Sequence, residues 1–166
     1  MQFKVGDRVV HPTYGVSHID RLEERQLAED ESRLYYVLIA DKTTVWVLVE
    51  ARAEIALRQV TPRGDLDRYR RLLKGLPDPL AKDHVKRRAQ IADRLRQGSF
   101  LALCETVRDL AARGWRRPLN DADSSLLQRL RVSMCREWAA SSGVTLAEAL
   151  DEVDALLSEA RRVSMT

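Results

Sequence analysis

Apolar and polar residues alternate with a period of two over much of the first sixty positions, and this pattern is typical of β-strands. The alternating or apolar segments are short, and we expect strands over residues 7–11, 16–22, 34–39 and 43–49, with a short closing strand over 55–60. Pro12 and Gly15, and further on Asp41 and Lys42, stand where tight turns need them. Short strands joined by tight turns predict a small barrel-like sheet.

The apolar period changes to 3.6 after residue 61, where Pro62 and Gly64 interrupt the strand pattern. Five helices are expected from there on, beginning near residues 65, 80, 99, 120 and 145. Thr145 with Glu148 is the signature of a capping box at the last of them. The chain is therefore predicted to be of the α+β class, with a small β-barrel or sheet domain over residues 1–61 and an all-α helical domain over 62–166.

Charge is distributed unevenly along the chain, although the net charge is only +3. Residues 1–61 have a net charge of −2 and residues 118–166 a net charge of −3. Residues 62–117 contain 15 basic and 7 acidic side chains, a net charge of +8. A positive field that is confined to one segment indicates a polyanionic partner facing it.

The second predicted helix has the densest part of this charge. Its basic side chains are Lys82, Lys86, Arg87, Arg88, Arg94 and Arg96. Only Asp83 and Asp93 oppose them; Lys82 and Lys86 are one helical turn apart, and Asp83 is spaced to reach Arg87. Two interpretations stay open: a solvated helix whose charges pair among themselves, and a surface that binds nucleic-acid phosphates.

Catalytic motifs are not found: there is no phosphate-binding loop, dinucleotide fingerprint or nucleophile elbow. We expect no enzyme activity, no cofactor and no metal site. Cys104 and Cys135 lack the spacing of metal ligands and are expected to be reduced core thiols. The longest apolar run is too short to span a bilayer and the start of the chain does not resemble a secretory signal, so we expect a cytoplasmic protein without membrane contact.

The three tryptophans differ in their surroundings. Trp138 lies on an apolar helical stripe and is expected in the core. Trp46 lies on the strand face opposite Val45 and Val47, which leaves a core role and a contact role equally open. Trp115 stands beside two arginines, a setting that suits a nucleic-acid surface and ordinary loop packing equally well.

The opening segment from Phe3 to Val16, FKVGDRVVHPTYGV, resembles the start of CarD-type regulators, also called CdnL, whose pattern there is roughly FxxGDxVVxPxxGV. The four residues from Val107 to Leu110, VRDL, are similar to a second segment of that family. The order of a β domain and a helical domain rich in Lys and Arg also fits. The resemblance covers nearly the whole chain, and the transcription-repair coupling factor shares the β domain.

This resemblance implies a bacterial transcription regulator associated with the nucleoid. Its N-terminal domain would be Tudor-like and would bind the RNA polymerase β subunit, with one copy of the chain per polymerase. Its helical domain would contact double-stranded promoter DNA at the upstream edge of the melted bubble, where an aromatic wedge in the minor groove stabilises the open complex. An alternative from a different class is a polymerase-docked adaptor whose helical domain recruits a protein partner and does not contact DNA.

Carried over position by position, the resemblance implies polymerase contacts at Arg25, Leu27 and Trp46. The implied DNA contacts are Lys82, His84, Lys86, Arg87 and Arg88. His84 stands where the family usually has its wedge tryptophan, and Trp46 replaces a basic contact of some family members. Because histidine offers less apolar area than tryptophan, the sequence predicts weaker stabilisation of the bubble.

Overall fold

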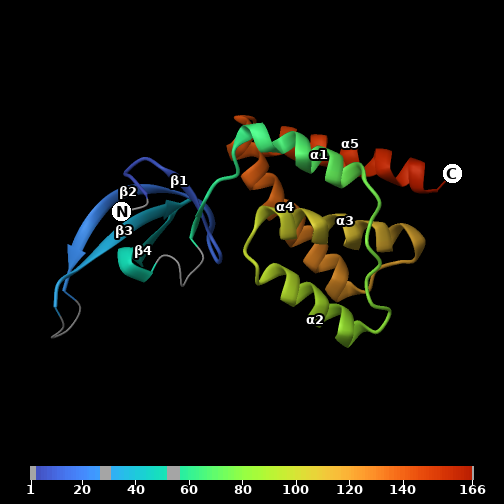
Figure 1. The fold of residues 1–166 in the computed structure, drawn as a ribbon, viewed down its shortest axis with the longest axis horizontal. Helices are drawn as coiled ribbons and strands as arrows, with labels where there is room; N and C mark the ends of the chain where they lie inside the picture. The colour runs from blue at the N-terminus through green and yellow to red at the C-terminus, as the bar shows by residue number, and fades with distance from the viewer. Residues whose placement is uncertain (1–2, 27–30, 52–56, 166) are drawn as a thin grey trace. The chain divides into compact units, whose positions relative to one another are not determined.

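The chain folds into two compact units, Met1–Val60 and Thr61–Thr166 (Figure 1). The computed structural model describes residues 3–26, 31–51 and 57–165. The predicted contact Leu27 and the first residues of the predicted closing strand lie outside the described residues. The α+β prediction is confirmed, because a five-stranded antiparallel sheet is followed by five α-helices that pack together.

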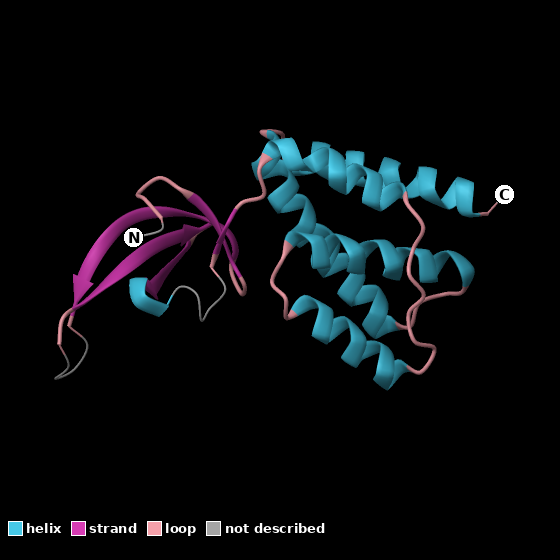
Figure 2. Ribbon diagram, in the orientation of Figure 1, coloured by secondary structure: helices cyan, strands magenta, loops and turns pink. Residues whose placement is uncertain are grey.

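The N-terminal unit is a single sheet with the strand order β4-β3-β2-β1-β5 (Figure 2). Its strands are β1 (Arg8–His11), β2 (Gly15–Arg25), β3 (Arg33–Ala40), β4 (Thr43–Leu48) and β5 (Arg58–Gln59). Asp41, in the turn that joins β3 to β4, has a φ of 56°. Aspartate tolerates this left-handed conformation because its short polar side chain bonds locally, so the expected tight turn forms.

The two faces of this sheet differ, as the alternating pattern requires. One face buries an apolar cluster that consists of Phe3, Val9, Ile19, Tyr36, Leu38, Val47, Val49 and Leu57. Trp46 lies on the other face, where 41% of its surface is exposed. Its partner across β3 is Val37, which is fully buried on that same face. The sheet therefore presents a second, partly apolar face outside its own core.

The helical unit consists of α1 (Leu66–Lys74), α2 (His84–Leu95), α3 (Phe100–Arg116), α4 (Asp121–Ser142) and α5 (Leu146–Ser164). Side-chain caps begin four of them, with Asp83, Ser99, Asn120 and Thr145 each accepting a backbone N–H of the first turn. The predicted capping box of Thr145 and Glu148 is present. Gly143, at a φ of 73°, ends α4 in the left-handed conformation that favours glycine.

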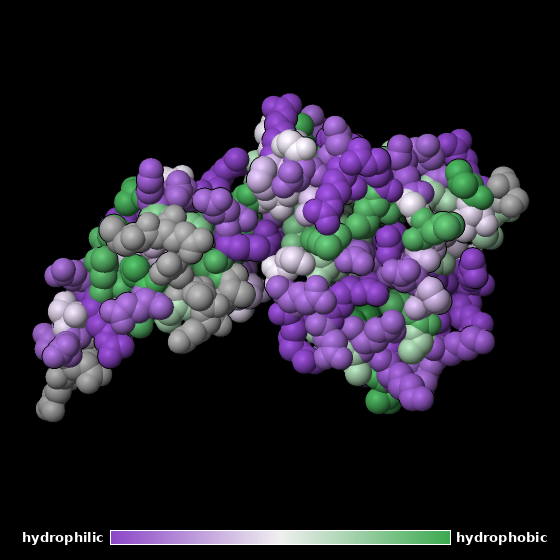
Figure 3. Space-filling view, in the orientation of Figure 1, coloured by the Kyte–Doolittle hydropathy of each residue, from purple (hydrophilic) through white to green (hydrophobic). Residues whose placement is uncertain are grey.

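Trp138 is fully buried at the centre of the helical core, as its stripe predicted. Cys104 and Cys135 are both free and buried in the same cluster, which confirms the prediction for the thiols. Burial raises the pKa of the Cys135 thiol to about 12, so this thiol stays protonated at neutral pH. Hydrophilic side chains cover most of the face of this unit that Figure 3 shows. No helix in the described ranges combines the length and the apolar character needed to cross a membrane.

The start of α2 differs from the sequence prediction. A helix was expected from about residue 80, but α2 begins at His84. Asp83 has extended backbone and caps the helix by accepting the Lys86 backbone N–H at 3.0 Å, so the helix begins after it. Lys82 therefore precedes the helix, and it does not share a helical face with Lys86 as its spacing suggested.

Candidate functional site

The outer face of the sheet brings together two of the residues expected to contact a partner. The Arg25 guanidinium lies over the Trp46 ring, with its Cζ 4.8 Å from the ring centroid. The Trp46 indole Nε1 donates a hydrogen bond to Glu23 Oε2 at 2.7 Å. Glu23 and Arg25 are two positions apart on β2, so both project from this face. We call Glu23, Arg25 and Trp46 the outer-face cluster.

Both partners of Trp46 hold its ring in one orientation without burying it. A cation over an exposed aromatic ring contributes about 0.5–1 kcal/mol, which is enough to bias the side-chain conformation. Glu23 also lies near Arg21, whose Nη2 is 3.6 Å from Glu23 Oε2. An exposed, pre-oriented tryptophan beside an arginine has the composition of a binding hot spot, where these two residue types are enriched.

The basic side chains in α2 and directly beside it fall into two groups, and neither interpretation of the sequence explains both. Three of them form ion pairs: Arg87 with Asp123, Arg94 with Asp109, and Arg96 with Asp93. Lys82, Lys86 and Arg88 are exposed, and within the described part of the chain they form no ion pair. Self-pairing explains the first group, whereas the second group is solvated and stays available to a partner outside the unit.

Arg87 is the predicted DNA contact that the structure places elsewhere. It is only 3% exposed. Its Nε donates to Asp123 Oδ2 at 2.8 Å, and its Nη1 donates to the backbone oxygens of Ala81 and Lys82 at 3.1 and 2.9 Å. Asp83, expected to pair with Arg87, caps the helix instead. Arg87 therefore fixes the start of α2 against α4, and its guanidinium is not presented to solvent.

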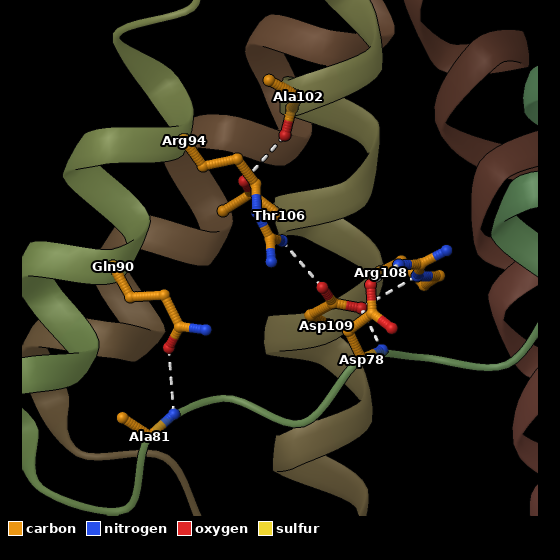
Figure 4. Close-up of polar contacts among 8 residues, drawn as sticks. All are labelled: Asp78, Ala81, Gln90, Arg94, Ala102, Thr106, Arg108 and Asp109. Atoms are coloured by element: carbon orange, nitrogen blue, oxygen red, sulfur yellow. Dashed lines mark hydrogen bonds and ion pairs between the residues drawn. The ribbon is translucent and has the colours of Figure 1, made fainter.

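A second buried carboxylate, that of Asp109, connects α2 and the segment before it to α3 through hydrogen bonds (Figure 4). Asp109 accepts from Arg94 Nη1 at 2.7 Å, from Arg108 Nε at 2.8 Å and from the Asp78 backbone N–H at 3.0 Å. Gln90 adds a bond by accepting the Ala81 backbone N–H at 3.0 Å. The VRDL segment singled out in the sequence thus has a structural role, because two of its residues form this network.

His84 is exposed at the first position of α2, which leaves its ring accessible. The next residue, Val85, is 63% exposed, and it was missed by the sequence reasoning. The sequence feature that could have identified Val85 is the Asp83 cap. A helix that begins after Asp83 places Val85 on the opposite side from the buried Arg87 and Ile91. His84 and Val85 together offer a planar ring and an apolar side chain at the tip of the helix.

Replacing Arg87 by alanine is expected to destabilise the helical unit by about 3–5 kcal/mol, because Asp123 would remain buried without its partner. Arg88→Ala is the matched control, since it removes the same charge from the next, exposed position and is expected to change stability by less than about 0.5 kcal/mol. Urea unfolding followed by circular dichroism measures both values. Equal effects of the two substitutions would contradict the structural role of Arg87.

Comparison with known proteins supports the resemblance seen in the sequence. Residues 3–61 match the family described as CarD-like/TRCF RID domain, where RID denotes an RNA polymerase-interacting domain. The chain is also similar to a protein of Bacillus subtilis (strain 168) named "Putative transcription factor YdeB". The two are 24% identical over 148 residues, which cover 86% of this chain and 94% of YdeB.

The family match begins at Phe3, in the core of the sheet, and ends just beyond β5. It includes all three residues of the outer-face cluster. The similarity to YdeB continues into the helical unit, beyond the reach of the family match. The N-terminal unit of this chain therefore matches the CarD-like/TRCF RID domain family over residues 3–61.

Proposed function

We propose that this protein is a transcription regulator that binds the RNA polymerase β subunit through the outer face of its sheet and promoter DNA through the start of α2. Bound in this way, it stabilises the open complex. The observation that carries the proposal is the outer-face cluster, an exposed tryptophan held by Arg25 within a domain of the polymerase-interacting family. Non-enzymatic regulation fits that family, and the proposed mechanism needs no cofactor.

The proposed docking surface for the polymerase is organised around Trp46 before any partner binds. Trp46 lies on β4, which is the end strand of the described sheet, so a partner reaches it without displacing another strand. Its ring is already oriented by Arg25 and Glu23, which lowers the entropy lost when a partner covers it. The β subunit is the partner we propose, and Trp46 supplies most of the apolar contact.

Trp46→Ala and Arg25→Glu are each expected to weaken binding to the isolated β subunit by tenfold or more, since truncating a hot-spot residue costs about 2 kcal/mol. Tyr14→Ala is the control, because it removes an exposed aromatic side chain of the same unit outside the cluster. Biolayer interferometry with immobilised β subunit measures the affinities. Unchanged binding of both cluster variants would remove the proposed docking surface.

The proposed DNA surface consists of the exposed cations near the start of α2 that form no ion pair within the described residues. Lys82, Lys86 and Arg88 are exposed around the first turns of α2, where the nearest buried cation, Arg87, is neutralised by Asp123. Three exposed cations of this kind bind phosphates by releasing condensed counterions, and this binding carries little base information. The expected binding is therefore sensitive to salt and tolerant of sequence.

The double substitution Lys86→Ala with Arg88→Ala is expected to weaken binding to double-stranded DNA and to reduce the slope of log K against log salt by about 1.8, since each phosphate contact contributes about 0.9. Arg161→Ala with Arg162→Ala is the control, because it removes the same charge from exposed positions at the end of α5. Fluorescence anisotropy at several salt concentrations measures both. Equal slopes for the wild type and the α2 variant would favour the adaptor alternative, in which the helical unit does not contact DNA.

His84 and Val85 form the proposed wedge at the bubble edge. The histidine ring stacks on an exposed base step, and the valine adds apolar area that histidine lacks. Unstacking a base step costs a few kcal/mol, so the wedge binds DNA that is already distorted better than regular duplex. Stabilisation of the open complex follows from this difference in affinity, because equal affinity for both states would shift neither.

His84→Trp is expected to lengthen the lifetime of the open complex, because the larger indole buries more apolar area at the unstacked step. Gln97→Trp, beyond the other end of α2, adds the same side chain at an exposed position away from the wedge and is the control. The lifetime is measured as the dissociation of polymerase from a promoter after addition of a competitor. If His84→Trp gave no longer lifetime than the wild type or the control, position 84 would not act as a wedge.

A further inference from the structure

A cavity of about 390 Å³ opens in the helical unit beside the segment that precedes α2. The second half of α3 forms one wall and residues 77–82 form the other. Its volume is within the range of small-molecule sites, which is roughly 300–1,000 Å³. Apart from Lys82, none of its lining residues belongs to the surfaces described above.

The charge of the lining is positive once internal pairing is taken into account. Four cations line the cavity: Lys82, Arg113, Arg116 and Arg117. Within the described residues, none of these four forms an ion pair. The two acids of the lining, Asp78 and Asp109, are held by Arg108, and Asp109 also by Arg94 (Figure 4). Both acids of the lining are thus paired with arginines, and Asp123, the acid that acts on Arg113, is itself paired with Arg87. The four cations therefore exceed the acidic charge around them.

Arg113 shows the effect of this arrangement most directly. It is half-buried, and burial together with the nearby charges of Arg87 and Arg117 lowers the pKa of its guanidinium. Like charges that are gathered in a partly enclosed space raise the free energy of the empty site. A bound anion would relieve this repulsion, so the favourable occupant is negatively charged.

The remaining lining adds a second chemical feature. Pro77, Pro79, Leu80 and Ala112 contribute apolar surface to the cavity. A site that combines several cations with apolar side chains suits a ligand that has an anionic group and a flat, weakly polar group. Arginine donates two parallel hydrogen bonds to phosphate oxygens, which favours phosphate among the anions.

We propose that this cavity binds the di- or triphosphate chain of a small nucleotide. Arg113, Arg116 and Arg117 contact the phosphates, and the prolines pack against the nucleoside. This site goes beyond the proposed promoter function and does not depend on it, because the ligand is bound by the helical unit without polymerase or DNA. Occupation would join α3 to the segment before α2, and so link a soluble metabolite to the segment that positions Lys82 and His84.

An ordinary structural explanation exists for the same arginines. Cations in the last turn of a helix complement its partial negative charge, and Arg113 and Arg116 are in the last turn of α3. That explanation predicts a loss of stability when the arginines are removed and no binding of phosphates. The two explanations are therefore separated by a binding measurement.

Isothermal titration calorimetry on the full chain at low salt tests the proposal with inorganic pyrophosphate, ATP and a short double-stranded DNA as separate probes. Pyrophosphate and ATP are expected to bind at one site per chain. Arg116→Ala with Arg117→Ala is expected to weaken both by about tenfold or more, since hydrogen bonds to charged groups are among the stronger ones. Arg161→Ala with Arg162→Ala, which removes the same charge from residues outside the cavity lining, is expected to leave them unchanged within about twofold.

Three results would overturn the proposal: no binding of pyrophosphate or ATP, an equal loss in both double variants, or an effect of the α3 variant on DNA alone. The last result would assign these arginines to the DNA backbone. Circular dichroism checks that each variant folds. If the α3 variant did not fold, Lys82→Ala in the exposed segment before α2 replaces it and is expected to weaken pyrophosphate binding in the same direction.

Discussion

The polar network around the buried carboxylate of Asp109 positions α2 and the segment before it against α3. The carboxylate joins Arg94 of α2, Arg108 of α3 and the backbone of Asp78 in one network. A buried charge is tolerated only where partners compensate the loss of water, and here three donors do so. Because α2 buries few apolar side chains of its own, these polar contacts, together with Arg87 and Asp123, decide where its first turn lies.

This constraint separates the cations of the unit into two kinds. Arginines with several donors are used inside, where their planar groups bond to carboxylates and to backbone oxygens at once. Lys82, Lys86 and Arg88 stay at the surface without an ion pair among the described residues, and their charge is available to a polyanion. The positive net charge of residues 62–117 therefore overstates the binding surface, because part of it balances acids within the fold.

The sheet unit follows a different principle. Its core occupies one face, and the opposite face is partly apolar because Val37 is buried there. Trp46 is held on this face by one cation and one carboxylate, so its exposure is a consequence of strand alternation and not of a loose side chain. The unit that matches the CarD-like/TRCF RID domain thus presents an exposed aromatic side chain that is already oriented.

The α+β class, most strand positions, the capping box of the last helix and the core role of Trp138 follow from the sequence alone, because they depend on periodicity and on bonds between neighbouring residues. The sequence also placed Trp46 opposite the core of its own strand, since alternation is a local property. Only the tertiary structure decided that Arg87 is buried and Arg88 exposed. The partner of Arg87 lies 36 positions further along the chain, and no local pattern encodes such a pairing. The cationic cavity has the same origin, because its walls come from segments that meet only when α3 packs against the residues before α2.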